Sequence, residues 1–266
     1  MIGMAPFRTR QWPRALVLAC VLAAACGGSR DEMPANIANP DRFLFDRGMA
    51  ELKDEHWIRA REYFRQVVDN YPGSPLRPEA KLAIGDAYFG EGTAESYVLA
   101  ANEYQEFLTF YPTHPRADYA QFRLALTHYE QMRAPERDQT ETKAALQEFQ
   151  VFFQRYPDSP LMPEARKRWR EARDRLSEAS LRVGIHYYRI RWCPGAVSRF
   201  REILKEDPEF TRRDSVYFYL AECLAGSDTP AGRAEAIPYY ERIVQEFTRS
   251  EHLDDARKRL EKLKRQ

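Results

Sequence analysis

Apolar residues recur from residue 40 onward at the three- and four-residue spacings of amphipathic helices. These helical stretches end repeatedly at Tyr-Pro or Asp-Pro. The prolines that close them are Pro72, Pro112, Pro157 and Pro208, which follow one another at intervals of 40, 45 and 51 residues. Proline cannot continue a helix, and it disfavours helical geometry in the residue before it. The pattern therefore predicts an all-α chain built from repeated helical segments.

Each repeat carries the same set of small and aromatic residues. A small residue in a first helix is followed by a small residue in a second helix, an aromatic residue four positions later and a proline eight positions after that. The five sets are Gly48, Ala60, Phe64 and Pro72; Gly85, Ala100, Tyr104 and Pro112; Ala125, Ala145, Phe149 and Pro157; Gly184, Ala196, Phe200 and Pro208; and Ala221, Ala236 and Tyr240 with Thr248 in place of proline. This set is typical of tetratricopeptide repeats, whose paired helices bury a continuous core only when stacked. We expect a superhelical solenoid of about five such helix-turn-helix repeats, with an atypical last repeat that caps it.

A basic segment divides the repeats into two groups. Residues 164–182 have a strongly helical pattern without an internal Pro or Gly, and we expect one long helix there, joining repeats 1–3 (40–163) to repeats 4–5 (183–266). Its arginines alternate with acids, which favours a solvated helix face with ion pairs four residues apart. A docking surface for an acidic partner is the alternative.

The start of the chain is typical of an exported lipoprotein. Arg8, Arg10 and Arg14 precede the apolar run 15–25, which is too short to span a bilayer and ends in small residues before Cys26. We expect residues 1–25 to be a signal peptide, as in a bacterial lipobox, and Cys26 to be acylated. Several acyl chains, palmitate among them, would give the stable anchoring that one chain does not.

Two other interpretations of this segment stay open. Residues 23–25 also match an ordinary A-x-A cleavage site, and Cys20 is a weaker acylation candidate because it would leave a shorter apolar run. Gly27 follows Cys26 where inner-membrane lipoproteins have Asp, which favours the outer membrane. Residues 26–39 are polar and without periodicity, so we expect a flexible tether.

Composition excludes several classes of function. Lys and Arg total 41 and Asp and Glu total 40, and this balance argues against nucleic-acid binding, which needs a basic surplus. We found no phosphate loop, metal-binding motif or nucleophile elbow, so we expect neither an enzyme nor a cofactor. The five histidines are isolated from one another: His56, His114, His128, His186 and His252.

Two cysteines lie in the fourth and fifth repeats. Cys193 begins a second helix and Cys223 lies late in the next first helix, so both should lie on the same side of the stack. An oxidising periplasm permits a disulfide between them. We expect two separate, small, buried residues instead, because free Cys is among the most buried residue types.

Three segments resemble the BamD (ComL) family of outer-membrane assembly lipoproteins. They are PTHPRADYA at 112–120, ERDQTETKAALQEFQVFFQRYPDSPLMPEA at 136–165 and RDRLSEASLRVGIHYYRIRWCPGAVSRFREILKEDP at 173–208. The RDQT element at 137–140 is among the most specific parts of the resemblance. That family has a lipobox followed by five tetratricopeptide repeats, and the resemblance covers essentially the whole mature chain.

The resemblance implies a function in the periplasm, on the inner face of the outer membrane. It implies that the C-terminal repeats bind a POTRA domain of the BamA-type β-barrel insertase, that the N-terminal repeats receive unfolded outer-membrane proteins, and that other assembly lipoproteins are further candidate partners. The alternative is a periplasmic tetratricopeptide-repeat lipoprotein that scaffolds another cell-envelope or secretion complex.

Both functions imply binding residues. In a tetratricopeptide repeat the first helix lines the concave face, and an apolar groove there would suit an extended client peptide. The groove residues that we predict are Phe45, Met49, Leu52, Leu82, Phe89, Tyr119, Phe122, Leu126 and Tyr129. For the insertase we predict Arg199 as the anchor, because Arg is favoured at charged interface contacts, with Arg201, Tyr187 and Tyr188 as weaker candidates. The alternative for Arg199 is a local salt bridge with Glu202 or Glu206.

Overall fold

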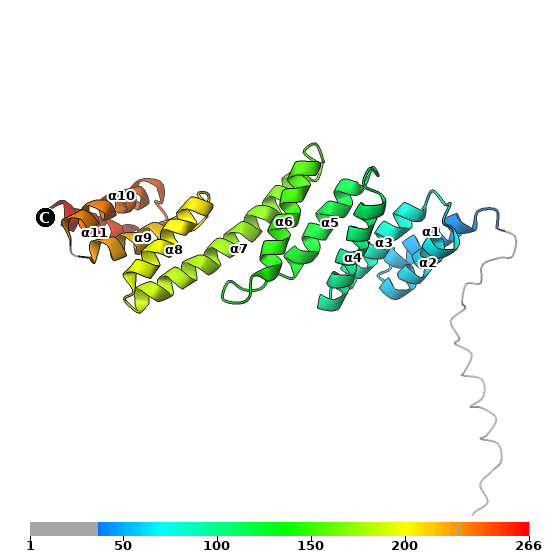
Figure 1. Cartoon of the computed structure of the whole chain (residues 1–266), viewed down its shortest axis with the longest axis horizontal. Helices are drawn as coiled ribbons and strands as arrows, with labels where there is room; N and C mark the ends of the chain where they lie inside the picture. Colours follow the sequence, from blue (N-terminus) through cyan, green and yellow to red (C-terminus); the bar gives the residue numbers. More distant parts are fainter. Residues whose placement is uncertain (1–36, 228, 266) are drawn as a thin grey trace, which may run out of the picture. The chain divides into compact units, whose positions relative to one another are not determined.

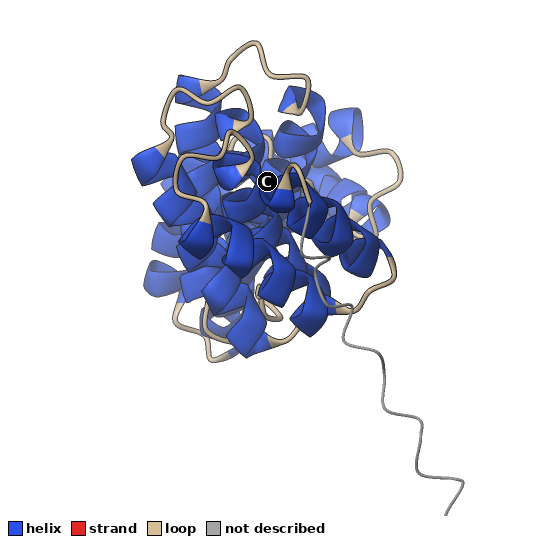
Figure 2. Ribbon diagram, turned by 90° about the vertical axis from the view of Figure 1, so that its right-hand side faces the viewer, coloured by secondary structure: helices blue, strands red, loops and turns tan. Residues whose placement is uncertain are grey.

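The computed structural model describes residues 37–227 and 229–265. The described part contains helices and loops without a β-strand (Figure 2). Its helices follow one another in chain order (Figure 1): α1 (Pro40–Lys53), α2 (Trp57–Asn70), α3 (Arg77–Glu91), α4 (Ala94–Phe110), α5 (Ala117–Glu130), α6 (Thr140–Arg155), α7 (Met162–Arg189), α8 (Cys193–Glu206), α9 (Arg213–Ala225), α10 (Pro230–Glu246) and α11 (Leu253–Lys264). The prediction of an all-α repeat solenoid is confirmed.

The repeated small and aromatic residues form the contacts inside each helical pair. The five aromatic members are fully buried: Phe64, Tyr104, Phe149, Phe200 and Tyr240. A Cβ atom added to Gly48 would lie 2.5 Å from the Phe64 ring, and one added to Gly85 would lie 2.8 Å from the Tyr104 ring. The small residues are needed because the aromatic ring of the second helix lies directly against the backbone of the first.

A serine-to-aspartate hydrogen bond closes three of the turns between repeats. Ser74 donates to Asp41 (2.5 Å), and Ser159 donates to Asp118 (2.6 Å). The same serines accept the backbone N–H two residues later, so each caps its own turn. Ser250 makes an equivalent bond to Asp214. These bonds tie the end of one repeat to the first helix of that repeat.

Helix α7 is the longest element. It contains the predicted joining segment 164–182 and continues to Arg189 without a break at 182, so it also supplies the first helix of the fourth repeat. Three ion pairs four residues apart lie on it, Arg168–Glu164 (2.8 Å), Arg170–Asp174 (2.9 Å) and Arg182–Glu178 (3.0 Å). Helix α11 follows the fifth pair; it packs on α10 and lies beyond the ten helices of the five pairs.

The buried apolar side chains form three clusters. One runs from Leu44 to Leu124, a second joins α5, α6 and the start of α7, and a third begins at Leu181 and covers the last two repeats. Between Trp169 and Leu181, the buried residues of α7 are Ala172 and Ser177. The apolar core is therefore thin in the middle of α7.

Candidate protein-binding surfaces

The predicted client groove stays a prediction, and its residues differ in how far they are exposed. Leu82 is fully buried and Phe122 is 6% exposed, packed against Phe149 and Phe152, so these two belong to the core and offer no surface to a peptide. Met49 is 43% exposed. The other six predicted residues are half-buried: Phe45, Leu52, Phe89, Tyr119, Leu126 and Tyr129. A spacing rule identifies the inner face of a helix, but it does not show which positions of that face the adjacent helices cover.

The first helices of the second and third repeats share a polar and aromatic cluster. Asp86 accepts hydrogen bonds from Tyr104 (2.7 Å) and Tyr119 (2.9 Å). Arg123 lies 3.3 Å from the same carboxylate, and its guanidinium lies 3.7 Å from the centre of the Phe89 ring. Burial and the Asp86 carboxylate raise the pKa of the Tyr119 phenol. Phe89 and Tyr119 are thus held in fixed positions in the middle of the predicted groove.

The same arrangement recurs at the other end of the chain. Glu222 accepts a hydrogen bond from Tyr240 (2.6 Å) and forms an ion pair with Arg259 (2.9 Å). In both places the tyrosine follows the acid by 18 residues and the arginine follows it by 37. This acid–tyrosine–arginine set is absent from the residues predicted above, although its regular spacing is visible in the sequence.

A tyrosine and an ion-paired arginine lie at the α7 end of the predicted groove. The Tyr129 hydroxyl donates to Glu171 (2.5 Å), and Arg168 lies over the Tyr129 ring at 5.2 Å. Burial and the hydrogen bond to Glu171 raise the pKa of the Tyr129 phenol. The hydroxyl group and the ring of the half-buried Tyr129 are therefore both held in place by residues of α7.

The four predicted insertase residues divide between two hollows. Arg199 and Tyr187 line a hollow of about 560 Å³, whereas Arg201 and Tyr188 line another of about 880 Å³. Consecutive residues of a helix point about 100° apart, which explains why Tyr187 and Tyr188 separate. Arg199 donates to Glu202 at 2.9 Å, so the local salt bridge that was the alternative for this residue is present in the chain.

The RDQT element contributes to the same hollow as Arg199. Arg137 and Gln139 come from the loop before α6, and they line the hollow together with Val183 and Tyr187 of α7. Two segments that carry the family resemblance, about 60 residues apart in sequence, therefore meet at one surface.

A buried ion pair joins α7 to the end of the fourth repeat. Arg170 donates to both carboxylate oxygens of Asp207, at 2.9 and 2.6 Å, and Ser177 donates to one of them at 2.5 Å. The Asp207 side chain is only 3% exposed. Burial opposes ionisation of Asp207, but the hydrogen bonds from Arg170 and Ser177 outweigh it and lower the pKa of the carboxyl.

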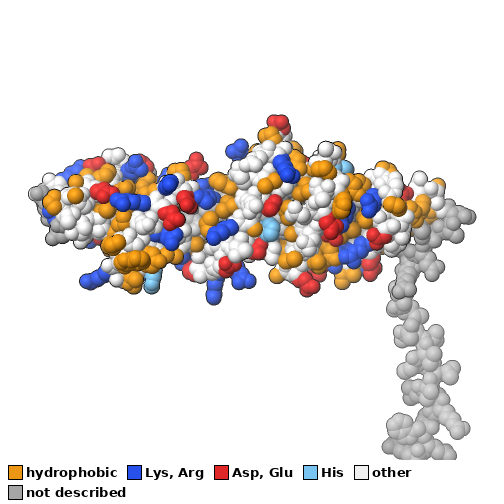
Figure 3. All heavy atoms as spheres, in the orientation of Figure 1, with side chains coloured by type: hydrophobic (Ala, Val, Ile, Leu, Met, Phe, Trp, Pro, Cys, Tyr) orange, Lys and Arg blue, Asp and Glu red, His pale blue; other side chains and the backbone are white. Residues whose placement is uncertain are grey.

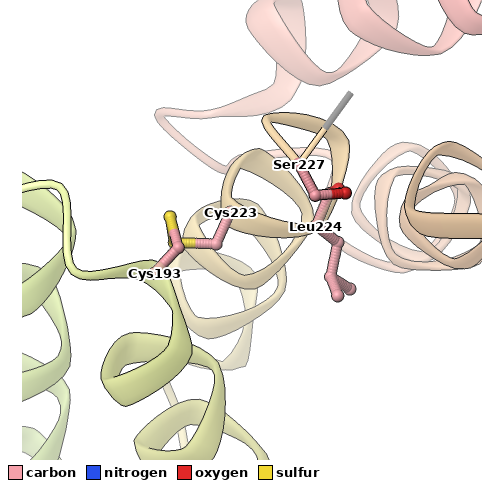
Figure 4. The surroundings of a disulfide bond; sticks show 4 residues. All are labelled: Cys193, Cys223, Leu224 and Ser227. Carbon is pink, nitrogen blue, oxygen red and sulfur yellow. A yellow bond between two sulfur atoms is a disulfide. The ribbon is translucent and has the colours of Figure 1, made fainter. Parts of the chain in front are cut away.

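The structure joins Cys193 and Cys223 in a disulfide, with their Cα atoms 5.3 Å apart (Figure 4). The expectation of two separate buried residues is therefore corrected. The start of α8 and the end of α9 lie side by side, which brings the two sulfur atoms together. The disulfide forms part of the wall of the 880 Å³ hollow, beside Leu224 and Ser227.

Residues 37–225 match the family YfiO, described as "Outer membrane lipoprotein". The chain belongs to this family. The matched span contains the first four helical pairs and α9, so it includes the Arg199 hollow, the predicted groove and the disulfide.

Curated relatives of this YfiO-family chain are named "Outer membrane protein assembly factor BamD". One from Caulobacter vibrioides is 27% identical over 210 residues, covering 78% of this chain and 68% of the relative. One from Vibrio cholerae is 27% identical over 203 residues, covering 73% and 82%. The resemblance to the BamD family is confirmed.

Similar solved structures include a tetratricopeptide repeat protein from Parabacteroides merdae, at 15% identity and a TM-score of 0.36, covering 85% of this chain and 74% of that one. Another is the TPR2AB domain of yeast Sti1 in complex with an Hsp90 peptide, at 12% identity and a TM-score of 0.44, covering 84% and 98%.

Some predictions about this YfiO-family chain concern residues outside the described part. The signal peptide (1–25), Cys26 and most of the tether (26–39) belong to this group. Over residues 37–227 and 229–265, no helix is both long and apolar enough to cross a membrane, and no group of His, Cys, Asp and Glu is arranged to hold a metal ion.

Proposed function

We propose that this protein is a non-enzymatic scaffold of the outer-membrane β-barrel assembly machinery. The observation that carries the proposal is the YfiO family match over residues 37–225, together with relatives named as BamD assembly factors. The acid, tyrosine and arginine side chains of the repeats are engaged with one another, as expected of a binding protein whose surfaces are held in place. A pulldown from solubilised outer membrane tests the proposal. A POTRA-containing barrel protein should copurify, and its absence from an intact preparation would contradict the proposal.

The second part of the proposal is attachment to the periplasmic face of the outer membrane through acylated Cys26. The family description as an outer membrane lipoprotein supports this anchor. Labelling cells with a palmitate analogue should mark the wild-type protein and leave Cys26→Ser unmarked. Cys20→Ser should be marked like the wild type, because Cys20 lies within the segment that cleavage removes. A labelled Cys26→Ser protein would rule out this anchor.

The third part assigns the insertase contact to the Arg199 hollow. Arg199, Arg137 and Tyr187 line it, and the Arg199 side chain is 36% exposed despite its bond to Glu202. Charge reversal at an interface arginine costs several kcal/mol because it places like charges together. Arg199→Glu should therefore abolish copurification of the barrel protein.

The matched control for this test is Lys205→Glu. Lys205 is exposed on the same helix, outside the hollow, so the variant has the same change of charge. It should retain the partner. Equal copurification with Arg199→Glu and Lys205→Glu would remove the hollow from the proposal but leave the family-based function standing.

The fourth part assigns client binding to the half-buried aromatic residues of the first helices. Phe89 and Tyr119 are positioned by Asp86 and Arg123, and Tyr129 is positioned by Glu171. Aromatic anchors held in this way contribute most to binding an extended peptide. Tyr129→Ala should weaken binding of a C-terminal peptide of an outer-membrane protein at least tenfold. Phe110→Ala, which removes a ring that is 68% exposed on α4, should leave the affinity unchanged.

A further inference from the structure

Two adjoining hollows lie at the C-terminal repeats, apart from the Arg199 hollow. The larger one, about 880 Å³, lies where α7 ends, α8 begins and α9 ends. The smaller one, about 290 Å³, lies between α9, α10 and α11. Glu222 and Gly226 line both, so the two are continuous at the end of α9.

The lining of these hollows is strongly basic. Arg189, Arg191 and Arg201 line the larger hollow, and Arg233, Arg259 and Lys262 line the smaller one. Glu222 is the single acid among the lining residues of both, and it is already bound by Arg259 and Tyr240. The lining therefore has a large surplus of positive charge in a chain whose total charge is +1.

Three of these cations are available to a ligand. The side chains of Arg189, Arg191 and Lys262 make no ion pair or hydrogen bond with any residue in the described part of the chain. Arg201, by contrast, pairs with Glu235. All three are exposed to solvent at the edge of the hollows. A cluster of cations without a counter-charge raises the local concentration of anionic ligands.

The floor of the larger hollow is apolar. The Cys193–Cys223 disulfide forms part of it together with Pro194, Val197 and Leu224. The adjacent α7–α8 turn exposes Ile190 (58%) and Trp192 (50%), and Figure 3 shows hydrophobic side chains gathered at this turn beside Lys and Arg side chains. Apolar floor and basic rim together match a ligand that is both acidic and apolar.

We propose that these joined hollows dock an acidic, extended polypeptide segment of a partner protein. Its carboxylates would pair with Arg189, Arg191 and Lys262, and an apolar side chain would contact the disulfide floor. The two hollows together are lined by residues from the end of α7 to α11, so an extended polypeptide can reach the cations of both. The site is separate from the Arg199 hollow, because Tyr187 and Tyr188 face different sides of α7. One chain can therefore hold two partners at its C-terminal repeats.

The test uses the purified mature chain and a fluorescent nonapeptide with a central Phe flanked by four Glu on each side. We expect saturable binding. The reversal Arg189→Glu/Arg191→Glu should weaken it at least tenfold, and Lys143→Glu/Lys167→Glu should weaken it less than twofold. The control has the same net charge change at exposed positions outside the hollows. Equal losses in the two variants would mean non-specific charge attraction and would overturn the proposal.

Two further measurements test the apolar floor of the hollow and the alternative that the surface binds lipid. Replacing the central Phe of the peptide by Ser should weaken binding at least threefold. An unchanged affinity would contradict the contact between this side chain and the apolar floor. Vesicles rich in phosphatidylglycerol should not compete with the peptide. Vesicle binding that is lost with Arg189→Glu/Arg191→Glu, without peptide binding, would assign the surface to lipid instead.

A milder variant guards against misfolding. Arg191 has a backbone φ of +62°, which glycine adopts without strain. Arg189→Gln/Arg191→Gly therefore removes both charges and preserves the turn. It should lose binding at least fivefold with an unchanged circular dichroism spectrum, and full binding by this folded variant would refute the site.

Discussion

The two ends of the repeat array are built from the same kind of helical pair, but different interactions stabilise them. In repeats 1–3 two apolar clusters, both in contact with Tyr156, extend from α1 to the start of α7. Repeats 4–5 have their own apolar cluster, and they add a disulfide between α8 and α9. Between the two regions the middle of α7 is held largely by charged groups. Apolar stacking therefore builds each region, while specific polar and covalent bonds fix the C-terminal one.

The polar joint in α7 extends beyond the Arg170–Asp207 pair. Glu178 accepts hydrogen bonds from Arg212 at 2.8 and 3.0 Å, and it pairs with Arg182, which also reaches Glu136 in the loop before α6. Ion pairs exposed to water contribute little individually, so the buried Arg170–Asp207 pair should dominate the joint. The comparison predicts that bonds specific to the C-terminal region are the most costly to remove.

The largest expected effect comes from the disulfide. Removing it with Cys193→Ser/Cys223→Ser should lower the free energy of unfolding by about 4 kcal/mol, because the bond closes a long loop between residues 30 apart in sequence. The measurement is urea unfolding followed by circular dichroism. Dithiothreitol should destabilise the wild type by the same amount and leave the double variant unchanged. Equal stability of the wild type and the double variant would show that the disulfide does not stabilise the C-terminal repeats.

Breaking the buried ion pair ranks second. Arg170→Ala should cost about 3 kcal/mol, because it leaves the Asp207 carboxylate buried without its main partner. Arg166→Ala removes an exposed arginine one turn earlier and should stay within about 0.5 kcal/mol of the wild type. Equal losses of stability in the two variants would contradict a specific stabilising contribution of the buried Arg170–Asp207 pair.

The same pair predicts a dependence on pH. The folded-state pKa of Asp207 is lowered, so its contribution is complete above the ordinary Asp value of about 3.9 and is lost as the pH falls through the lower folded value. Asp207→Asn should therefore be less stable than the wild type at pH 7. The difference should shrink as the pH falls below about 4, and a constant difference would contradict the assignment.

The acid–tyrosine–arginine sets give a smaller, direct comparison of the two ends. Tyr104→Phe removes a hydroxyl that joins Asp86 to Arg123, and it should cost about 1.5 kcal/mol. Tyr240→Phe should cost less, because Arg259 is 53% exposed whereas Arg123 is 19% exposed, so water replaces the lost hydroxyl more readily at the C-terminal set. Urea unfolding of the two variants measures the difference. A larger loss for Tyr240→Phe would reverse the predicted order.

The sequence predicted the repeats because their contacts are local. Gly48 and Phe64, or Gly184 and Phe200, meet within one helical pair, so a fixed spacing identifies them. Leu82 and Phe122 were misassigned because the spacing rule does not show which positions of a helix its neighbours cover, and Phe122 is covered by Phe149 and Phe152 of its own repeat. The disulfide depends on how two helix ends meet, and the Arg170–Asp207 pair crosses 37 residues. Spacing alone fixes neither of these longer-range contacts.

The smallest expected effect tests a feature that the two ends share. Glu55 (φ +60°) and Arg191 (φ +62°) both adopt left-handed geometry after the first helix of their repeats. In each turn, the next residue donates its N–H to the carbonyl five positions earlier, from His56 to Glu51 and from Trp192 to Tyr187, both at 2.9 Å. Glycine is the usual residue at such a position because it adopts this geometry without strain.

Glu55→Gly and Arg191→Gly should therefore each stabilise the chain by roughly 0.5 kcal/mol, the relief of strain less the entropy that glycine adds to the unfolded state. Lys53→Gly, inside the last turn of α1, should destabilise it by about 1 kcal/mol. Differential scanning calorimetry of the three variants gives the sign directly. A gain at residue 55 without one at residue 191 would show that the C-terminal turn is held by its surroundings, with the disulfide at Cys193 as the nearest constraint.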